Sequence, residues 1–318
     1  MNILIMGAGA LGSVAGGFLA NKGHHVSLIG RRLHMDTVAS QGLQIRGIWG
    51  EHRVEGMHVL SKPEVLPSLS FDLVLMAVKS YDTATAADLI APYVSDNTLI
   101  CSYQNGLGNA EVLAQKFGWN RVIGARVIFG ARVYEPGAVE VTVMAAPTAL
   151  GAYPGGPSKE RIAVIVKAMA DAGLPTVMTD EIRTLLWEKV AYNCALNPLS
   201  ALLDVPYGAL AESFYTRTVM AEVIEELYAT AHRLRVPLKP DCSDAWLDHF
   251  YQNLLPPTAA HYASMREDLL RGRRTEIDAL NGAIARFGNE QGISCPTNAL
   301  LTALVHAREK TPACPSSL

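Results

Sequence analysis

Short runs of aliphatic and β-branched residues alternate with stretches of helical periodicity along the first half of the chain. Runs of this kind, bounded by turn residues, are typical of strands buried in a sheet. Strands that alternate with helices indicate a parallel sheet covered by helices. The pattern predicts strands at Asn2–Met6, Val26–Ile29, Asp72–Val78 and Thr98–Ser102, and helices at Leu11–Asn21, Thr83–Ile90 and Asn109–Phe117.

The pattern changes between residues 121 and 180. Strand-like runs from Arg121 to Leu150 flank Pro136-Gly137, and we interpret them as a hairpin that extends the sheet. A helix at Ser158–Ala172 and a strand at Thr176–Met178 are predicted to complete the first domain.

After about Asp180 the strand signals stop, and the further segments have helical periodicity with proline or glycine at the joints. We therefore expect an α/β domain with a parallel sheet over residues 1–180 and an all-helical domain over residues 181–318. The Ser/Pro-rich tail after Thr311 is expected to be loose. The predicted helices of the second domain are Glu181–Asn197, Tyr215–Arg235, Ser243–Leu254, Thr258–Arg271, Thr275–Gln291 and Thr297–Lys310.

The composition excludes several classes of protein. The chain has 318 residues, of which 49% are hydrophobic and 18% charged, and this excludes disorder, which needs low hydrophobicity and high net charge. It suits two cores and a buried interface between subunits, as in a homodimer. With a net charge of −3 the chain has no basic field for a phosphate backbone, so we expect no nucleic-acid partner.

Cysteine and histidine spacing exclude further classes. The five cysteines show no C-x-x-C spacing and the nine histidines no H-E-x-x-H, so we expect neither a disulfide framework nor a metal site. The first residues lack the charged segment of a signal peptide, and no apolar run approaches about 18 residues. We expect no membrane span, and a cytoplasmic enzyme or ligand-binding protein.

The hexapeptide Gly7-Ala8-Gly9-Ala10-Leu11-Gly12 follows the first predicted strand and opens the first helix. The G-x-G-x-x-G dinucleotide fingerprint requires this context. Gly7 permits the tight turn, Gly9 lets the backbone approach the pyrophosphate, and Gly12 allows close helix–strand packing. Amides at the helix start then hold the anion. An ordinary glycine-rich turn is the alternative, but the context favours a Rossmann-type site formed by all six residues.

Residues after the other strands indicate the cofactor. An acid after the second strand would bind the ribose 2′-hydroxyl of NAD, whereas this chain has Arg31, a type of residue that accommodates the 2′-phosphate of NADP. We therefore expect NADP(H), with an exposed arginine pair as the alternative. Lys79 and Asn105 follow two further strands and are expected at the same ligand edge, although Asn105-Gly106 is equally typical of a turn.

A polar row is predicted on the first helix of the second domain. Lys189, Asn193 and Asn197 are spaced by four residues on an otherwise largely apolar helix. Asparagine is a poor helix former, which favours the wall of a cleft over a solvated face. Two other candidates have structural alternatives: Thr275-Glu276-Ile277-Asp278 can be a helix start with Thr275 as N-cap, and Ser264 can be a surface serine.

Together these segments resemble the ketopantoate reductase (2-dehydropantoate 2-reductase) family nearly from end to end. The resemblance implies NADPH-dependent reduction of a 2-oxo acid, 2-dehydropantoate (ketopantoate), to pantoate, in the route to pantothenate. It rests on Gly7–Gly12, Arg31, Val78-Lys79, Asn105-Gly106, the run from Trp187 through Lys189, Asn193 and Asn197 to Leu199, Ser264-Met265 and Thr275–Asp278.

The resemblance also implies roles for single residues. Lys189 would be the general acid, and Glu276 would bind the cofactor ribose or the substrate hydroxyl close to that lysine. The chemistry agrees, because hydride delivery to a carbonyl builds negative charge on oxygen, which a lysine can stabilise and protonate. The resemblance implies that Lys79, Asn105 and Ala131 contact NADPH, and that Asn105, Asn193, Asn197 and Ser264 hold the substrate.

Two positions depart from the pantoate-specific pattern. This chain has Tyr207 and His261 where such members can carry asparagine, and both are expected at the substrate end of the site. The identity of the 2-oxo acid is therefore open. The alternatives are an NADPH-dependent reductase of another bulky 2-oxo acid, and a non-catalytic NADP(H)-binding sensor, in which Lys189 would have no required role.

Overall fold

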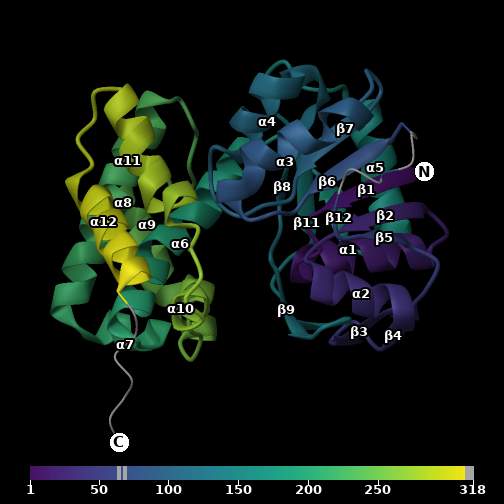
Figure 1. Cartoon of the computed structure of the whole chain (residues 1–318). Helices are drawn as coiled ribbons and strands as arrows, with labels where there is room; N and C mark the ends of the chain where they lie inside the picture. The colour runs from purple at the N-terminus through teal and green to yellow at the C-terminus, as the bar shows by residue number, and fades with distance from the viewer. Residues whose placement is uncertain (63–65, 67–69, 312–318) are drawn as a thin grey trace, which may run out of the picture. The chain divides into compact units, whose positions relative to one another are not determined.

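The computed structural model describes residues 1–62, 66 and 70–311, which form two compact units (Figure 1). The first unit comprises Met1–Ile182 and contains the strands, and the second begins at Arg183 and is helical. The tail predicted to be loose after Thr311 lies outside the described residues, as does Cys314. Within the described ranges, no helix is long and apolar enough to cross a membrane.

A twisted, mostly parallel sheet forms the centre of the first unit. Its strands are β1 (Asn2–Met6), β2 (His25–Ile29), β5 (His58–Leu60), β6 (Leu73–Met76), β7 (Leu99–Ser102), β8 (Val122–Arg126), β11 (Thr148–Ala152) and β12 (Thr176–Met178). Their order is β12-β11-β8-β7-β6-β1-β2-β5. Neighbours from β5 to β8 are parallel, whereas β11 runs antiparallel to β8 and parallel to β12.

Helices cover both faces of this sheet. Since successive side chains of a strand point to opposite faces, each face has its own core. Ile3 and Ile5 belong to one core and Leu4 and Met6 to the other, which explains the continuous apolar run of β1. The helices are α1 (Ala10–Asn21), α2 (Arg32–Gln41) and α5 (Lys159–Asp171) on the Ile3 side, and α3 (Thr83–Ile90) and α4 (Asn109–Phe117) on the Leu4 side.

The predicted hairpin does not extend this sheet, contrary to expectation. It forms a separate sheet of order β4-β3-β10-β9, because β8 pairs with β11 and leaves the hairpin to pair with β3. Val139 of the hairpin is buried in the same core as α1, and Gly17 permits the close approach, since a Cβ there would lie 2.6 Å from Ile45 Cδ1. The strands are β3 (Leu43–Gly47), β4 (His52–Val54), β9 (Phe129–Glu135) and β10 (Ala138–Met144).

Between residues 30 and 71 no element is predicted, whereas the structure contains α2, β3, β4 and β5. The helix α2 buries only His34, Met35 and Val38, so its apolar periodicity is weak. The strands β4 and β5 have three residues each and depend on their pairing with β3 and β2. Tertiary pairing rather than local pattern determines this region.

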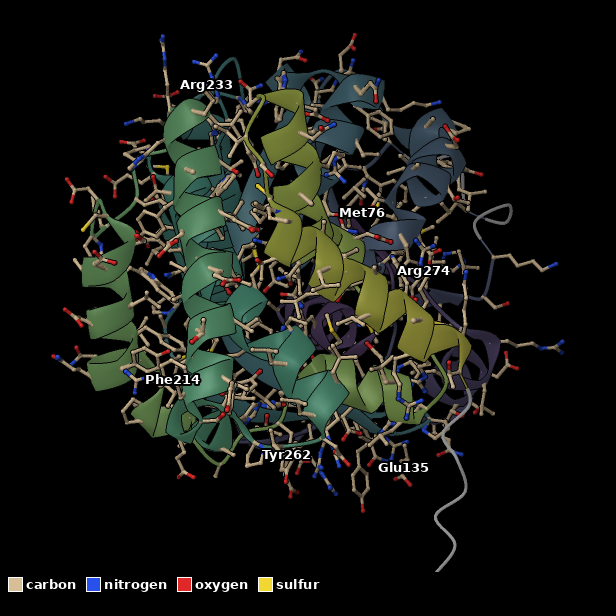
Figure 2. The ribbon with its side chains drawn as sticks, turned by 90° about the vertical axis from the view of Figure 1, so that its left-hand side faces the viewer. Met76, Glu135, Phe214, Arg233, Tyr262 and Arg274 are labelled. Atoms are coloured by element: carbon tan, nitrogen blue, oxygen red, sulfur yellow. The ribbon has the colours of Figure 1, made fainter. Side chains whose placement is uncertain are left out.

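The second unit consists of helices that pack around α6 (Ile182–Leu203) and α8 (Phe214–Arg233). Phe214 and Arg233 are labelled at the two ends of α8 in Figure 2. The helix α6 continues past its predicted end at Asn197, with Pro198 inside it. The other elements are α7 (Tyr207–Glu212), α9 (Ser243–His249), η5 (Phe250–Leu254), η6 (Pro256–Thr258), α10 (Ser264–Leu270), η7 (Ile277–Ala279), α11 (Asn281–Glu290) and α12 (Pro296–Lys310).

The predicted helix Thr258–Arg271 is an α-helix only from Ser264, where α10 begins. Residues 259–263 lack helical structure because a neighbouring segment engages their backbone. The carbonyl of His261 accepts a hydrogen bond from Tyr207 N at 2.9 Å. The carbonyl of Ala259 likewise accepts the N–H of Gly208 at 2.8 Å, and Ser264 is the first residue of an α-helix rather than an interior one.

Candidate functional site

The fingerprint loop joins β1 to α1 at the point where the strand order reverses. The strand β1 lies between β2 and β6, so the chain leaves it towards one side and later returns on the other. Ligands of open α/β sheets bind at such switch points, at the carboxyl ends of the strands. Gly7 N and Ala8 N both donate to Ile29 O, at 3.0 and 2.7 Å, and these bonds hold the loop on β2.

The surroundings of each glycine in the fingerprint explain why a residue without a Cβ stands there. Gly7 has a φ of +114°, and a Cβ there would lie 2.5 Å from Val78 N. At Gly12 a Cβ would lie 2.1 Å from Gly7 O, so α1 packs directly against its own loop. At Gly9 a Cβ would meet no atom within 4 Å, and no side chain caps the amides of α1. The space beside Gly9 is therefore open, as the backbone approach expected of a dinucleotide pyrophosphate requires.

Gly30, which the sequence analysis does not single out, is part of the same arrangement. A Cβ at Gly30 would lie 2.5 Å from Ala8 Cβ, so only glycine lets β2 end against the fingerprint loop. Arg31 follows as the exposed N-cap of α2, while Arg32 pairs with Asp36 at 3.4 Å. The structure thus places Arg31 at the carboxyl end of β2, next to the fingerprint.

Lys79 and Asn105 follow β6 and β7 at the same edge of the sheet. Buried polar side chains connect the two segments: Gln104 Nε2 donates to Thr83 Oγ1 at 2.8 Å and to the carbonyl that precedes Lys79 at 2.9 Å. Asn109 Nδ2 donates to Asn105 O at 2.9 Å. These bonds fix the backbone at both candidate residues. Gln104, a polar residue two positions after the buried strand β7, was the available sequence signal.

Ala131 is half-buried in β9. It packs against the same core cluster as Leu11 of the fingerprint, and β9 contacts α1. The structure therefore brings Ala131 to the side of the first unit that carries the fingerprint helix.

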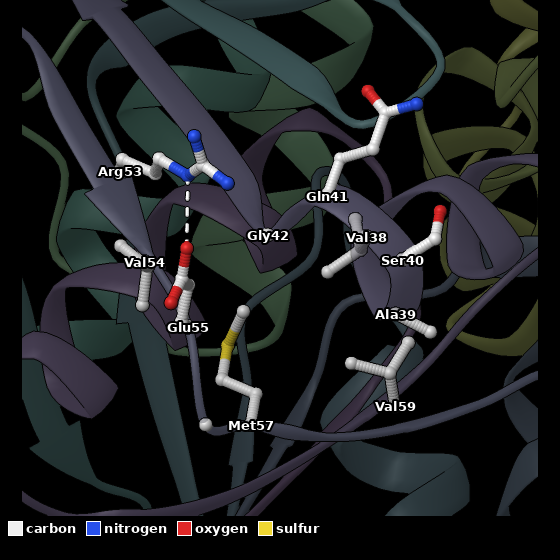
Figure 3. A pocket seen from close by; sticks show the side chains of 11 residues that line it. Val38, Ala39, Ser40, Gln41, Gly42, Arg53, Val54, Glu55, Met57 and Val59 are labelled. Atoms are coloured by element: carbon white, nitrogen blue, oxygen red, sulfur yellow. Dashed lines mark ion pairs between the residues drawn. The ribbon is translucent and has the colours of Figure 1, made fainter.

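A separate open pocket of about 260 Å³ lies beside the end of α2, β4 and β5 (Figure 3). Val54 and Met57 line it, and Arg53 and Glu55 at its wall form an ion pair of 2.9 Å. None of the site residues predicted from the sequence lines this pocket. It is therefore distinct from the candidate cofactor site.

In the part of the chain that the structure describes, no group of three or more His, Cys, Asp or Glu side chains could hold a metal ion. The four described cysteines are free thiols.

In the second unit, Lys189, Asn193 and Asn197 lie in one row on α6, since a spacing of four residues places side chains on one helix face. Lys189 and Asn193 are half-buried, and Asn197 is only 7% exposed. The neighbours Val190 and Cys194 belong to the core. The row is thus a polar strip on a largely buried helix, and a fully solvated face is excluded for Asn197.

Tyr207 and His261 meet at the Asn197 end of this row. Tyr207 Oη donates to Asn197 Oδ1 at 2.8 Å, and the Tyr207 and His261 rings lie 5.9 Å apart between centroids. Burial raises the pKa of Tyr207, so the hydroxyl stays protonated and keeps donating. With its oxygen engaged in this way, Asn197 offers a ligand chiefly its amide N–H donors, which suit a carboxylate or carbonyl oxygen.

Ser264 is exposed at the start of α10. The residue before it, Ala263, donates its N–H to Ser200 Oγ at 3.3 Å, and Ser200 follows Asn197 by three residues on α6. The backbone at Ser264 is therefore tied to the same end of α6 as Asn197.

Glu276 is half-buried and precedes η7. The predicted helix Thr275–Gln291 begins with this short 3₁₀ turn, and α11 starts only at Asn281, so Thr275 is not the N-cap of that helix. Asn281 Nδ2 donates to Cys194 O at 3.2 Å, which joins the segment that carries Glu276 to the middle of α6, beside Asn193.

Comparisons with known proteins cover both units. The family model described as ketopantoate reductase PanE/ApbA matches residues 3–155, and the model of its C-terminal region matches residues 181–309. A 2-dehydropantoate 2-reductase of Aquifex aeolicus is 38% identical over 97% of this chain and 97% of its own length.

Solved structures are similar to this chain over nearly its whole length. A PanE/ApbA family ketopantoate reductase from Ralstonia eutropha has a TM-score of 0.86 and 35% identity, with 97% of this chain and 98% of that chain covered. A D-mandelate dehydrogenase solved with NADH and anilino(oxo)acetate has a TM-score of 0.84 and 26% identity, with the same coverage of both chains.

Proposed function

This chain belongs to the ketopantoate reductase PanE/ApbA family, and from that premise we propose that it reduces 2-dehydropantoate to pantoate with NADPH. The observation that carries the proposal is the row of Lys189, Asn193 and Asn197 on α6, a lysine and two amides on a largely buried helix. We also propose a cofactor domain of residues 1–180 and a substrate domain of residues 181–318.

The choice of NADPH over NADH rests on Arg31. The family is NAD(P)-dependent, and the D-mandelate dehydrogenase of similar fold was solved with NADH. In this chain Gly30 and Arg31 follow β2, so no carboxylate is there to accept the ribose 2′-hydroxyl, and a guanidinium is there to bind a 2′-phosphate. Lys79, Asn105 and Ala131 are proposed as further cofactor contacts.

Lys189 is proposed as the general acid. NADPH, when bound, supplies a hydride to the 2-oxo carbon. The ammonium group of Lys189 stabilises the negative charge that develops on the carbonyl oxygen and donates a proton to it. Asn193, Asn197 and Ser264 hold the substrate, with the Asn197 amide donating to an oxygen, and Glu276 binds the terminal hydroxyl of the substrate or the cofactor ribose.

A second candidate function is reduction of another bulky 2-oxo acid. It is supported by the Tyr207–His261 ring contact beside Asn197, which puts aromatic side chains where pantoate-specific members can carry asparagine. The D-mandelate dehydrogenase of similar fold was solved with anilino(oxo)acetate, an aromatic ligand.

Steady-state NADPH oxidation with a panel of 2-oxo acids tests the proposal. We expect ketopantoate to be reduced and its hydroxyl-free analogue, 2-oxo-3-methylbutanoate, to be clearly poorer, because a site that hydrogen-bonds a hydroxyl discriminates strongly against its loss. The ratio of kcat/KM for the two acids should rise in Tyr207→Asn and His261→Asn. Efficient turnover of an aromatic 2-oxo acid with none of ketopantoate would favour the second candidate.

A homodimer is proposed from the composition of the chain alone, because a high share of hydrophobic residues and a low share of charged residues suit a buried interface between subunits. Sedimentation at equilibrium, with and without NADPH, would measure the mass of the assembly.

A further inference from the structure

We propose that His306 and Glu309 of α12 are positioning residues that hold the segment carrying Glu276 in place, with His306 acting as a doubly bonded imidazolium. The inference rests on the proposed function, in which Glu276 contacts the substrate hydroxyl or the cofactor ribose. His306 and Glu309 belong to no motif that the sequence analysis used.

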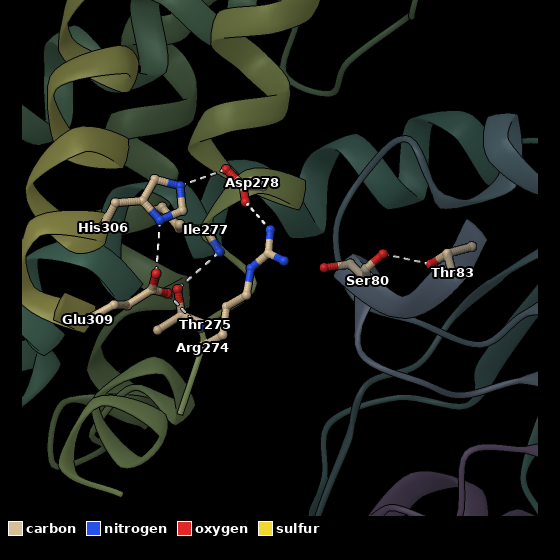
Figure 4. A network of polar contacts seen from close by, with 8 residues as sticks. All are labelled: Ser80, Thr83, Arg274, Thr275, Ile277, Asp278, His306 and Glu309. Carbon is tan, nitrogen blue, oxygen red and sulfur yellow. Dashed lines mark hydrogen bonds and ion pairs between the residues drawn. The ribbon is translucent and has the colours of Figure 1, made fainter. Parts of the chain in front are cut away.

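The Glu276 segment is anchored to α12 on both sides (Figure 4). Before it, Thr275 N donates to Glu309 Oε1 at 2.6 Å. After it, His306 Nε2 lies 2.8 Å from Asp278 Oδ1. His306 Nδ1 and Glu309 Oε2 are 2.9 Å apart and join the two anchors into one chain of bonds.

Bonds within the segment complete the arrangement. Thr275 Oγ1 accepts the N–H of Ile277 at 3.3 Å, and Arg274 Nη2 donates to Asp278 Oδ2 at 2.9 Å. Thr275 and Ile277, the direct neighbours of Glu276, are 1% and 0% exposed. The backbone on either side of Glu276 is thus buried and bonded, so the direction of its carboxylate depends on these anchors.

Both bonds of His306 require its charged form. Each ring nitrogen faces a carboxylate oxygen, which only accepts, whereas a neutral imidazole has a single N–H to donate. The hydrogen bond with Glu309 and that with Asp278 raise the pKa of His306 above its usual value, against the effect of burial.

The pKa values of the Glu309 and Asp278 carboxyl groups shift in the opposite direction, downwards. Burial raises the pKa of Glu309, but the hydrogen bonds from His306 and Thr275 outweigh it and hold that pKa below its usual value. Burial likewise raises the pKa of Asp278, and the hydrogen bonds from His306 and Arg274 hold it low. All charges of the network therefore coexist between the lowered pKa values of the two carboxylates and the raised pKa of His306.

Three charged side chains on the helices that pack against α12 have other partners. Glu222 and Glu226 of α8 bind the first turn of α12, about two helical turns from His306. Arg286 of α11 lies over an aromatic ring, 4.8 Å from its centroid. In the described structure the charges that bear on His306 are then the two carboxylates named above, one of which also binds Arg274.

The network should make kcat/KM for the 2-oxo acid decrease on the alkaline side of its pH profile. A raised histidine pKa means that the bonded form is complete at and below pH 6.5 and is lost as pH rises through the raised value. Above that pKa, His306 can donate to only one of Glu309 and Asp278, and the Glu276 segment is held less firmly. We expect kcat/KM for the 2-oxo acid to fall there, mainly through KM.

The test uses the full chain with NADPH and ketopantoate, and compares His306→Gln and Glu309→Gln with wild type from pH 6 to 9. Both variants should show a lower kcat/KM at pH 6, by up to about 10²-fold, the scale expected of a misplacement of about 1 Å. The alkaline limb should be absent in His306→Gln and should move to lower pH in Glu309→Gln. In Glu309→Gln the new amide can still accept from Thr275 N but removes the acceptor for Nδ1. His249→Gln and Glu290→Gln, at exposed positions of the same unit, are matched controls that should behave as wild type.

A second readout needs no turnover. The His306 ring C–H signal should titrate in NMR above 6.5 in wild type and shift towards that value in Glu309→Gln. If wild type turns over ketopantoate and both variants have the same kcat/KM and pH profile as wild type, the inference is overturned and the proposed function stays intact. A wild-type His306 pKa at or below 6.5 would overturn it as well. Absence of wild-type turnover with every 2-oxo acid would contradict the proposed function itself, and the titration would still decide whether His306 is held as an imidazolium.

Discussion

At the scale of single residues, Lys189 carries the proposed chemistry most directly, because it is the cationic member of the row on α6. A positioned general acid contributes about 10²–10⁴-fold to a rate. Lys189→Ala should therefore lower kcat by about this factor, while the dissociation constant of NADPH changes little. Single-turnover and steady-state measurements at saturating NADPH check this. A mutant with near-normal kcat would show that the row has no part in the chemical step.

Some of the candidate residues lie in sequence motifs, and others act only through contacts between distant segments. The fingerprint glycines, Arg31 and Lys189 lie in motifs whose spacing has a physical meaning along the chain. His306 and Glu309 do not, because each acts on a segment that is distant in sequence, at Asp278 and Thr275. A hydrogen bond between distant segments leaves no periodic signal.

At the scale of elements, His34 of α2 joins two helices and the hairpin. Its Nδ1 accepts the N–H of Gly137 at 2.9 Å, so the proton sits on Nε2, 3.1 Å from Ser13 Oγ of α1. The site is buried and needs the neutral ring, and burial lowers the pKa of His34. The unfolded chain then takes up a proton at a higher pH than the folded one.

The stability of the first unit should therefore decrease as pH falls below 6.5. His34→Asn keeps an acceptor near the Nδ1 position and does not titrate, so its thermal midpoint should lose this pH dependence. His34→Leu should cost about 1–3 kcal/mol at pH 7, because it leaves a buried N–H unpaired. Thermal and denaturant unfolding of wild type and both variants at pH 5 and 7 measure these effects, and identical pH profiles for wild type and His34→Asn would contradict the assignment.

At the scale of the whole molecule, cofactor binding should stabilise the fold. A ligand at 100 times its dissociation constant stabilises by about 2.7 kcal/mol. NADPH should raise the thermal midpoint more than NADH at equal concentration. Arg31→Ala should remove that difference, since a lost bond to a charged group costs about 1.5–3 kcal/mol. Scanning calorimetry of both proteins checks it. Equal shifts by both cofactors in wild type would contradict the role of Arg31.

The sequence by itself determined the class of the fold and most of the candidate residues. Buried parallel strands must be apolar on both faces, and the turn from β1 to α1 needs glycine at Gly7 and Gly12, so local pattern was sufficient there. Only the tertiary structure decided that the hairpin pairs with β3, that residues 259–263 stay non-helical, and that Tyr207 engages Asn197. In each case the partner lies on another element of the fold, and the free energy of a hydrogen bond or strand pairing between elements cannot be read from local periodicity.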